Sequence, residues 1–149
     1  MQPLLKDISH QIVWDLDRLI AELESYPDES IIWTKHKAVN NTAGHLGLHL
    51  IGNLNHFFGH MMGGTDYKRN RELEFNSAPI LVSEIAQQII ETKKVVETSL
   101  SAMTAEKLST RFPIDVFGFE MTYQYFIIRL ANHLSYHLGQ ISYHRRILA

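Results

Sequence analysis

Histidine repeats at helical spacing in two segments of the chain, and imidazole is the side chain most often bound to metal ions in proteins. Residues 132–144, NHLSYHLGQISYH, hold His133, His137 and His144. Each residue advances about 100° around a helix, so these imidazoles would lie within about 40° of one another. The other segment keeps its histidines within about 60°, and they are His45, His49, His56 and His60. Two helices with a stripe of imidazoles each are therefore predicted.

A metal site would need only part of these stripes. Histidines four residues apart on a helix have Cβ atoms about 5–6 Å apart, so both can bind one ion. A third histidine from a facing helix would leave a position for water or substrate, as in catalytic zinc sites. Neutral imidazole also binds nickel, copper and iron, so the ligands do not choose the metal. A solvated helix face that carries histidines by coincidence explains the same spacing without any metal.

The remaining histidines are expected to lie outside such a site. His56 and His60 would lie about 10 Å or more along the helix axis from His49, too far to share an ion with it. We expect them to be exposed or to belong to a second site. His10 and His36 have no histidine at helical spacing, so we expect them on the surface.

Composition limits the kinds of partner and of site. Fourteen basic and sixteen acidic residues give a net charge of −2, which predicts no nucleic-acid partner and no anionic membrane surface. The chain has no cysteine, so a transition-metal site would have to use histidine, carboxylate and water. The N-terminal stretch MQPLLKDISHQIVWDLDRL has neither the apolar core of a signal peptide nor a membrane-spanning run, and we expect a cytoplasmic protein.

Helical periodicity accounts for most of the sequence. We expect helices over about 3–26, 42–62, 79–100 and 122–148, each bounded by capping residues, proline or glycine. Residues 27–41 and 63–78 are expected to be loops. A stretch of short alternation, 103–119, is expected to be an irregular crossover with a small hairpin. The prediction is an all-α four-helix bundle, a single domain over residues 1–149, in which long second and third connections allow crossovers.

Three segments together resemble the DinB/YfiT-like family of metalloenzymes, and most closely a bacterial branch known mainly as a domain of unknown function. They are HLSYHLGQI (133–141), GLHLIGNLNHFFG (47–59) and DYKRNRELEF (66–75). The similarity covers essentially the whole chain. Each motif alone is weak, and the three in this order are fairly specific.

The resemblance implies a four-helix bundle of the DinB type with long crossover loops, often homodimeric, holding a divalent metal on three histidines. The matching positions are His133, His137 and His49, rather than His45 one turn earlier. Zinc or nickel is the expected metal. Family members of known activity include transferases and isomerases that use a low-molecular-weight thiol. Gln140 also matches the motif, as a hydrogen-bonding neighbour of the ligands or as a packing residue.

Two functions compete for this chain. The first is a metal-dependent transferase or hydrolase that acts on a small molecule, in which the metal lowers the pKa of a bound water or thiol. The second is a non-catalytic helical bundle that serves in association or ligand binding.

Other residues are candidates by type only. Glu72, Glu74 and Glu120 could serve as a general base, although no catalytic residue stands out. Arg69 or Arg71 could reach an anionic substrate, and a solvated charge run is the alternative. We expect Tyr136 and Tyr143 to pack in the core.

Overall fold

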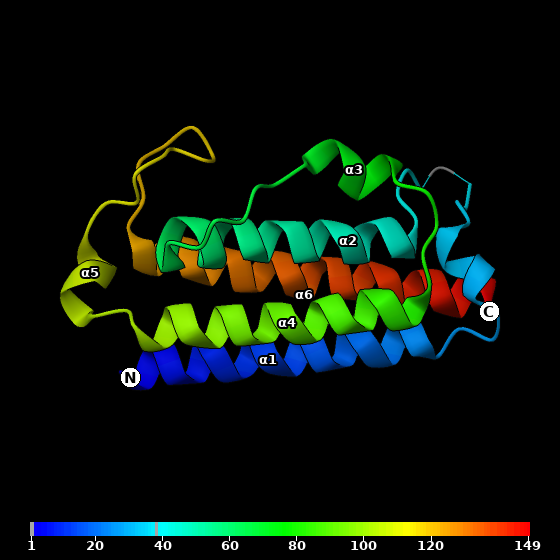
Figure 1. The fold of residues 1–149 in the computed structure, drawn as a ribbon, viewed down its shortest axis with the longest axis horizontal. Coiled ribbons are helices and arrows are strands. Elements are labelled where there is room, and N and C mark those ends of the chain that lie inside the picture. The colour runs from blue at the N-terminus through cyan, green and yellow to red at the C-terminus, as the bar shows by residue number, and fades with distance from the viewer. Residues whose placement is uncertain (1, 38) are drawn as a thin grey trace.

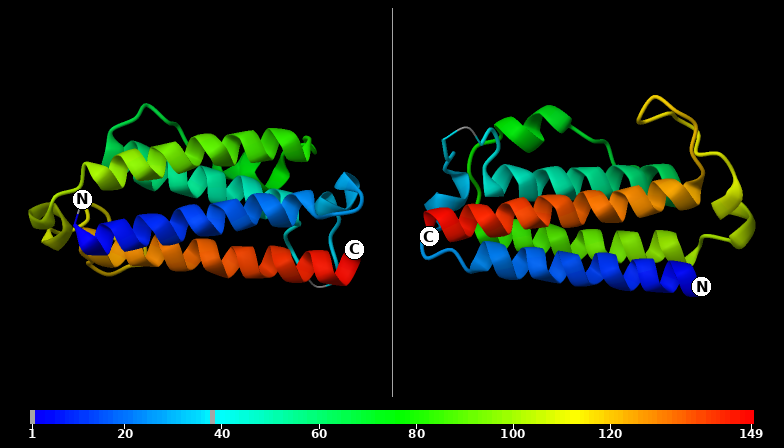
Figure 2. Two further views of the ribbon diagram at one scale, coloured as in Figure 1. Left: turned by 90° about the horizontal axis from the view of Figure 1, so that it is seen from below. Right: turned by 180° about the vertical axis from the view of Figure 1, so that it is seen from behind.

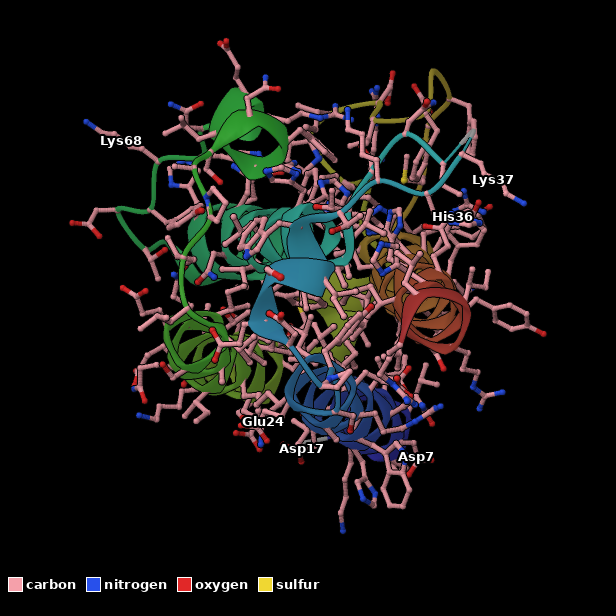
Figure 3. All side chains as sticks on the ribbon, turned by 90° about the vertical axis from the view of Figure 1, so that its right-hand side faces the viewer. Asp7, Asp17, Glu24, His36, Lys37 and Lys68 are labelled. Carbon is pink, nitrogen blue, oxygen red and sulfur yellow. The ribbon has the colours of Figure 1, made fainter. Side chains whose placement is uncertain are left out.

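Four long helices lie side by side in the part of the chain, residues 2–37 and 39–149, that the computed structural model describes (Figure 1). They are α1 (Pro3–Glu24), α2 (Ala43–Leu54), α4 (Val82–Ser101) and α6 (Tyr123–Leu148). Viewed end-on, α1 and α2 occupy opposite corners, and each packs against both α4 and α6 (Figure 3). No β-strand occurs among the described residues, so the all-α class is confirmed.

The core follows from the apolar periodicity of these helices. On α1 the buried residues Leu5, Ile12, Leu16, Leu19 and Leu23 recur three, four or seven residues apart, which keeps them on one face. They join apolar residues of the other long helices in one cluster. Among the described residues, no helix has both the length and the apolar character needed to cross a membrane.

The helix directions determine where the connections run. Both α1 and α6 point one way, and α2 and α4 point the other way (Figures 1 and 2). The chain between α2 and α4 must therefore return along the molecule, and it carries the short helix α3 (Arg71–Asn76), which packs on α2. The chain between α4 and α6 carries α5 (Ala105–Ser109) and stays at one end (Figure 1). Of the two crossovers that the sequence allowed, the fold uses the one after α2.

Three short helices were missed by the sequence interpretation. The 3₁₀ helix η1 (Glu29–Trp33) and α3 lie in segments predicted to be loops, and α5 lies in the segment predicted to be an irregular crossover. Helices this short have no room for a 3.6-residue repeat. Their signal is the N-cap, as at Asn70, whose side chain accepts a hydrogen bond from the backbone N–H of Leu73. Of the expected small hairpin, an isolated antiparallel bridge between Arg111 and Thr122 forms, and the described residues of this segment contain no strand.

The second helix reaches Met62 as predicted, but its winding changes on the way. After Leu54 it continues as the π-helix η2 (Asn55–Met62). The Asn55 amide donates to the backbone carbonyl of Ile51 and to Thr92 Oγ1 of α4, and such insertion of a side chain disturbs the regular backbone ladder. A π-turn advances less than 100° per residue. The predicted stripe of imidazoles is therefore broken after α2.

Gly44→Ala and Gly139→Ala are expected to change the free energy of unfolding in opposite directions. A Cβ at Gly44 of α2 would lie 2.7 Å from ring carbons of Trp33, and such overpacking costs about 1–3 kcal/mol. A Cβ at Gly139 of α6 would meet nothing within 4 Å. There the better helix propensity of alanine should stabilise the protein by up to about 1 kcal/mol. Urea denaturation measures the free energy of unfolding of both variants. Equal changes in the two variants would contradict the close packing of Trp33 on α2.

Candidate metal centre

Three of the predicted histidines meet where α2 faces α6. His49 projects from α2, and His133 and His137 project from successive turns of α6. The Nε2 atom of His133 lies 3.2 Å from Nε2 of His49 and 3.0 Å from Nε2 of His137. The structure therefore brings all three predicted ligands together, and their arrangement could hold a metal ion.

Hydrogen-bond acceptors beside two of these imidazoles indicate which ring nitrogen carries the hydrogen. His49 Nδ1 lies 3.0 Å from Glu74 Oε1, and an ionised carboxylate can only accept a hydrogen bond, so this Nδ1 carries the hydrogen. His137 Nδ1 lies 2.6 Å from the amide oxygen of Gln140, which is likewise an acceptor. The amide nitrogen of Gln140 donates to the Tyr136 hydroxyl at 3.3 Å. The Nε2 atoms of His49 and His137 therefore present bare lone pairs toward His133.

His133 cannot satisfy both of those lone pairs. Its Nε2 can donate a hydrogen to only one of them, and its Nδ1 is buried without a hydrogen-bond partner in the described structure. A cation among the three Nε2 atoms would accept all three lone pairs. Ligand nitrogens in a tetrahedral zinc site lie about 3.3–3.4 Å apart, as Zn–N bonds of about 2.0–2.1 Å require. The separations from His133 are close to this value, so the residues fit a divalent metal that favours imidazole.

A buried carboxylate holds His49 in place. Besides the hydrogen bond from His49, Glu74 accepts two from Arg69, from Nε at 2.8 Å and from a terminal nitrogen at 2.8 Å. Gly52 of α2 makes room for this group, because a Cβ there would lie 2.0 Å from Glu74 Oε2. Burial raises the pKa of Glu74, but the hydrogen bonds from Arg69 and His49 outweigh it, so the pKa lies below its usual value. Glu74 is therefore ionised at neutral pH.

The α6 imidazoles are kept neutral. Burial is the largest cause that lowers the pKa of His133, to about 3, and the nearby imidazoles of His137 and His49 lower it further. Burial also lowers the pKa of His137, against the hydrogen bond to Gln140, which raises it. Neutral imidazole is the form that binds a metal ion.

Metal-free protein is expected to lose stability as the pH falls below about 6.5, the ordinary pKa of an unfolded histidine. Since the pKa of His133 is lower in the folded state, the unfolded chain takes up the proton first. The free energy of unfolding should therefore fall by at most about 1.4 kcal/mol per pH unit for each such histidine, between about pH 6.5 and the folded pKa. Urea unfolding in a chelator at several pH values between 7.5 and 5.5 measures the slope.

The exposed His10 gives the matched control for that experiment. His10→Gln should keep the slope of the original protein, and His133→Gln should reduce it. A free energy of unfolding that is equal at both ends of this pH range would contradict the neutral state of the α6 imidazoles.

The other described histidines lie away from this centre. His144 is buried and hydrogen-bonds to the Tyr26 hydroxyl at 2.8 Å and to the carbonyl of Thr34 at 2.7 Å, so it is a core residue. His45 contacts the Thr42 hydroxyl and the Ser77 carbonyl. His10 and His60 are exposed, as expected, and His36 and His56 are half-buried.

The remaining sequence candidates take different places. Glu72 is exposed on α3, and Glu120 pairs with Arg111 at 3.1 Å, so neither lies at the histidines. The expectation that Tyr136 and Tyr143 pack in the core was wrong, because their exposed fractions are 64% and 68%. Aromatic residues occur all around α6, so residue type alone does not identify its buried face.

A cavity of about 490 Å³ adjoins the three histidines. Its apolar wall is formed by Phe57, Phe75, Phe117, Phe126 and Leu130, and its polar wall includes three arginines. This volume falls in the usual range for small-molecule sites. Among the polar lining residues, the sequence interpretation did not single out Asn53 or Arg129. Each lies four residues from a site histidine on the same helix. This spacing places it on the same helix face as the histidine and could have identified it as a neighbour of the site.

Comparison with known proteins identifies a matching family, but the function of that family is unknown. A family model described as "Protein of unknown function (DUF1572)" matches residues 5–149. No curated protein matches the chain.

Proposed function

We propose, on the premise that the chain belongs to the DUF1572 family of proteins of unknown function, that it is a metal-dependent enzyme acting on a small molecule. One observation carries the proposal. The Nε2 atoms of His49 and His137 converge on Nε2 of His133, an arrangement that a bound divalent cation would stabilise and that hydrogen bonds among the three rings cannot fully satisfy. The adjoining cavity supplies room for a substrate.

Zinc or nickel is the proposed metal, because the donors are three imidazoles. Such an ion supplies Lewis-acid chemistry, which lowers the pKa of a coordinated water or thiol. The protein's part is to orient the ligands. Glu74 fixes the ring of His49, and Gln140 fixes the ring of His137. Aromatic side chains line the cavity beside these ligands.

The resemblance to DinB-like proteins supports a transferase or hydrolase, with a low-molecular-weight thiol as one candidate reactant. Each of the three similar segments contributes to the centre: 47–59 carries His49, 66–75 carries Arg69 and Glu74, and 133–141 carries the two α6 histidines. We propose that the arrangement is a DinB-type four-helix bundle and that residues 1–149 form a single domain.

The same resemblance leads us to propose a homodimer. An exposed apolar stripe along α6 supports it, formed by Tyr125, Ile128, Tyr136 and Tyr143, since large exposed apolar patches mark interaction surfaces. Light scattering should give about twice the chain mass of 17.2 kDa. A mass equal to one chain at micromolar concentration would contradict the dimer.

Activity of the metal-loaded protein tests the proposal as a whole. Tag-free protein loaded with zinc or nickel should catalyse either ester hydrolysis or transfer of a small thiol to an electrophile. The activity should disappear with a chelator and return with the metal. A protein that binds metal but stays inactive in such a screen would favour a non-catalytic helical bundle.

A further inference from the structure

The cavity beside the histidines is positively charged, although the chain as a whole carries a net charge of −2. Arg69, Arg71 and Arg129 line it, and no acidic residue of the described chain does. The charge of Arg69 is compensated by Glu74. Neither Arg71 nor Arg129 forms an ion pair with a described residue. Two uncompensated guanidinium groups therefore face the space next to the metal centre.

Arg129 is held in an orientation that suits a ligand. Its guanidinium carbon lies 4.7 Å from the ring centre of Phe117, and stacking on the ring face leaves the in-plane N–H groups free. On α6, Arg129 precedes His133 by four residues, which places both on one face. The Phe117 side chain also lines the cavity, so the cation and the apolar wall belong to the same surface.

Asn53 gives an independent indication of a polar ligand. It is 7% exposed, lies four residues after His49 on α2, and lines the cavity. Its amide oxygen is buried without a hydrogen-bond partner among the described residues. An amide oxygen only accepts hydrogen bonds, so an oxyanion would pair with Asn53 after a half-turn of the amide, which presents its NH₂ group instead.

We propose that the substrate is an organic anion, with a carboxylate or phosphate group bound by Arg71 and Arg129 and an apolar body packed on the phenylalanine wall. This inference rests on the proposed function, because it names the substrate class of that same centre. Guanidinium binds both kinds of oxyanion through paired N–H groups. Phe57, Phe75 and Phe126 offer the apolar body a surface that inorganic phosphate would not use. The anionic group fixes the orientation in which the reacting end reaches the histidines.

Binding to metal-free protein tests the inference, because an anion can also bind a metal ion directly. The probes are phenylacetate, phenyl phosphate, neutral phenylacetamide and inorganic phosphate, measured by ligand-observed NMR. The favoured anion should bind at least about tenfold more tightly than phenylacetamide, as hydrogen bonds to charged groups imply. The phenylacetate and phenyl phosphate results distinguish a carboxylate from a phosphate, and inorganic phosphate should bind weakly.

Variants locate the binding site. Arg71→Ala and Arg129→Ala should each weaken anion binding by about 10- to 100-fold and leave phenylacetamide unchanged. Both side chains are exposed, so folding should persist. Lys68→Ala and Arg146→Ala are controls that also remove one positive charge, at residues that do not line the cavity. The Lys68 side chain extends from the surface (Figure 3). Both variants should bind anions like the original protein.

The outcomes separate this inference from the proposed function. Equal affinity for phenylacetate, phenyl phosphate and phenylacetamide, or a preference that survives in the double arginine variant, would overturn the anion inference. Zinc binding is titrated independently in the same proteins. If zinc still binds when the anion preference is absent, only the anion inference fails and the metal centre stands. Anion binding in a protein that does not bind zinc would support the anion site and refute the metal-dependent function.

Discussion

His133→Ala is expected to lower the affinity for zinc by more than about 100-fold, while the metal-free protein keeps its stability. His133 Nε2 lies within 3.2 Å of both other ligand atoms, and without it only two of the three histidines that could hold the ion remain. Loss of groups that merely hydrogen-bond to ligands costs about 10- to 100-fold, and loss of a ligand should cost more. Stability should change little, because the variant also removes a buried Nδ1 that has no partner in the described structure. Competition with a chromophoric chelator measures the affinity.

His144→Ala is the matched control, because it removes a histidine from the same helix. His144 is buried between the Tyr26 hydroxyl and the Thr34 carbonyl. Its loss should lower the free energy of unfolding by about 1–3 kcal/mol and leave zinc affinity unchanged. Similar zinc affinities for His133→Ala and the original protein would show that these histidines are core polarity and form no metal centre.

Glu74→Ala is expected to lower both stability and metal affinity. The substitution leaves Arg69 and the Nδ1–H of His49 without their shared acceptor. Breaking a buried ion pair costs about 3–5 kcal/mol. Loss of the group that orients a ligand should weaken zinc binding by about 10- to 100-fold. Urea denaturation and zinc competition measure the two effects separately.

Two further variants on α3 refine this prediction. Glu74→Gln keeps an acceptor for His49 but removes the charge that Arg69 needs, so it should retain more zinc affinity than Glu74→Ala. Glu72→Ala removes an exposed carboxylate from the same helix and should change neither property. Zinc affinity unaffected in Glu74→Ala would mean that the carboxylate serves only to dock α3.

The ligand set could be predicted from sequence because its spacing is local. His133 and His137 are four residues apart, which alone places them on one face of a helix. The choice of His49 rather than His45 needed the family resemblance, since both lie on the same predicted stripe. The structure separates them: His45 contacts Thr42 and Ser77, and His49 points at α6.

Gln140, three residues from His137, could be predicted as a hydrogen-bonding neighbour, but the role of Glu74 could not, because its contact with His49 spans a long stretch of chain. Glu74 reaches His49 across 25 residues, by way of a connection whose only helix, in the described chain, is too short for a periodic pattern. The π-helix after Leu54 depends on Asn55 contacting Thr92 of another helix. Local sequence patterns carry no information on such tertiary contacts, and Glu74 was a candidate by residue type alone.

X-ray absorption of tag-free protein, combined with its metal content, tests the metal centre most directly. We expect one zinc or nickel ion per chain, with three imidazole nitrogens at about 2.0–2.1 Å if the ion is zinc and with the remaining ligands being oxygen. His133→Ala should lose the metal under the same purification. Protein that contains far less than one ion per chain even after zinc is supplied, or whose bound ion has no imidazole ligands, would contradict the account.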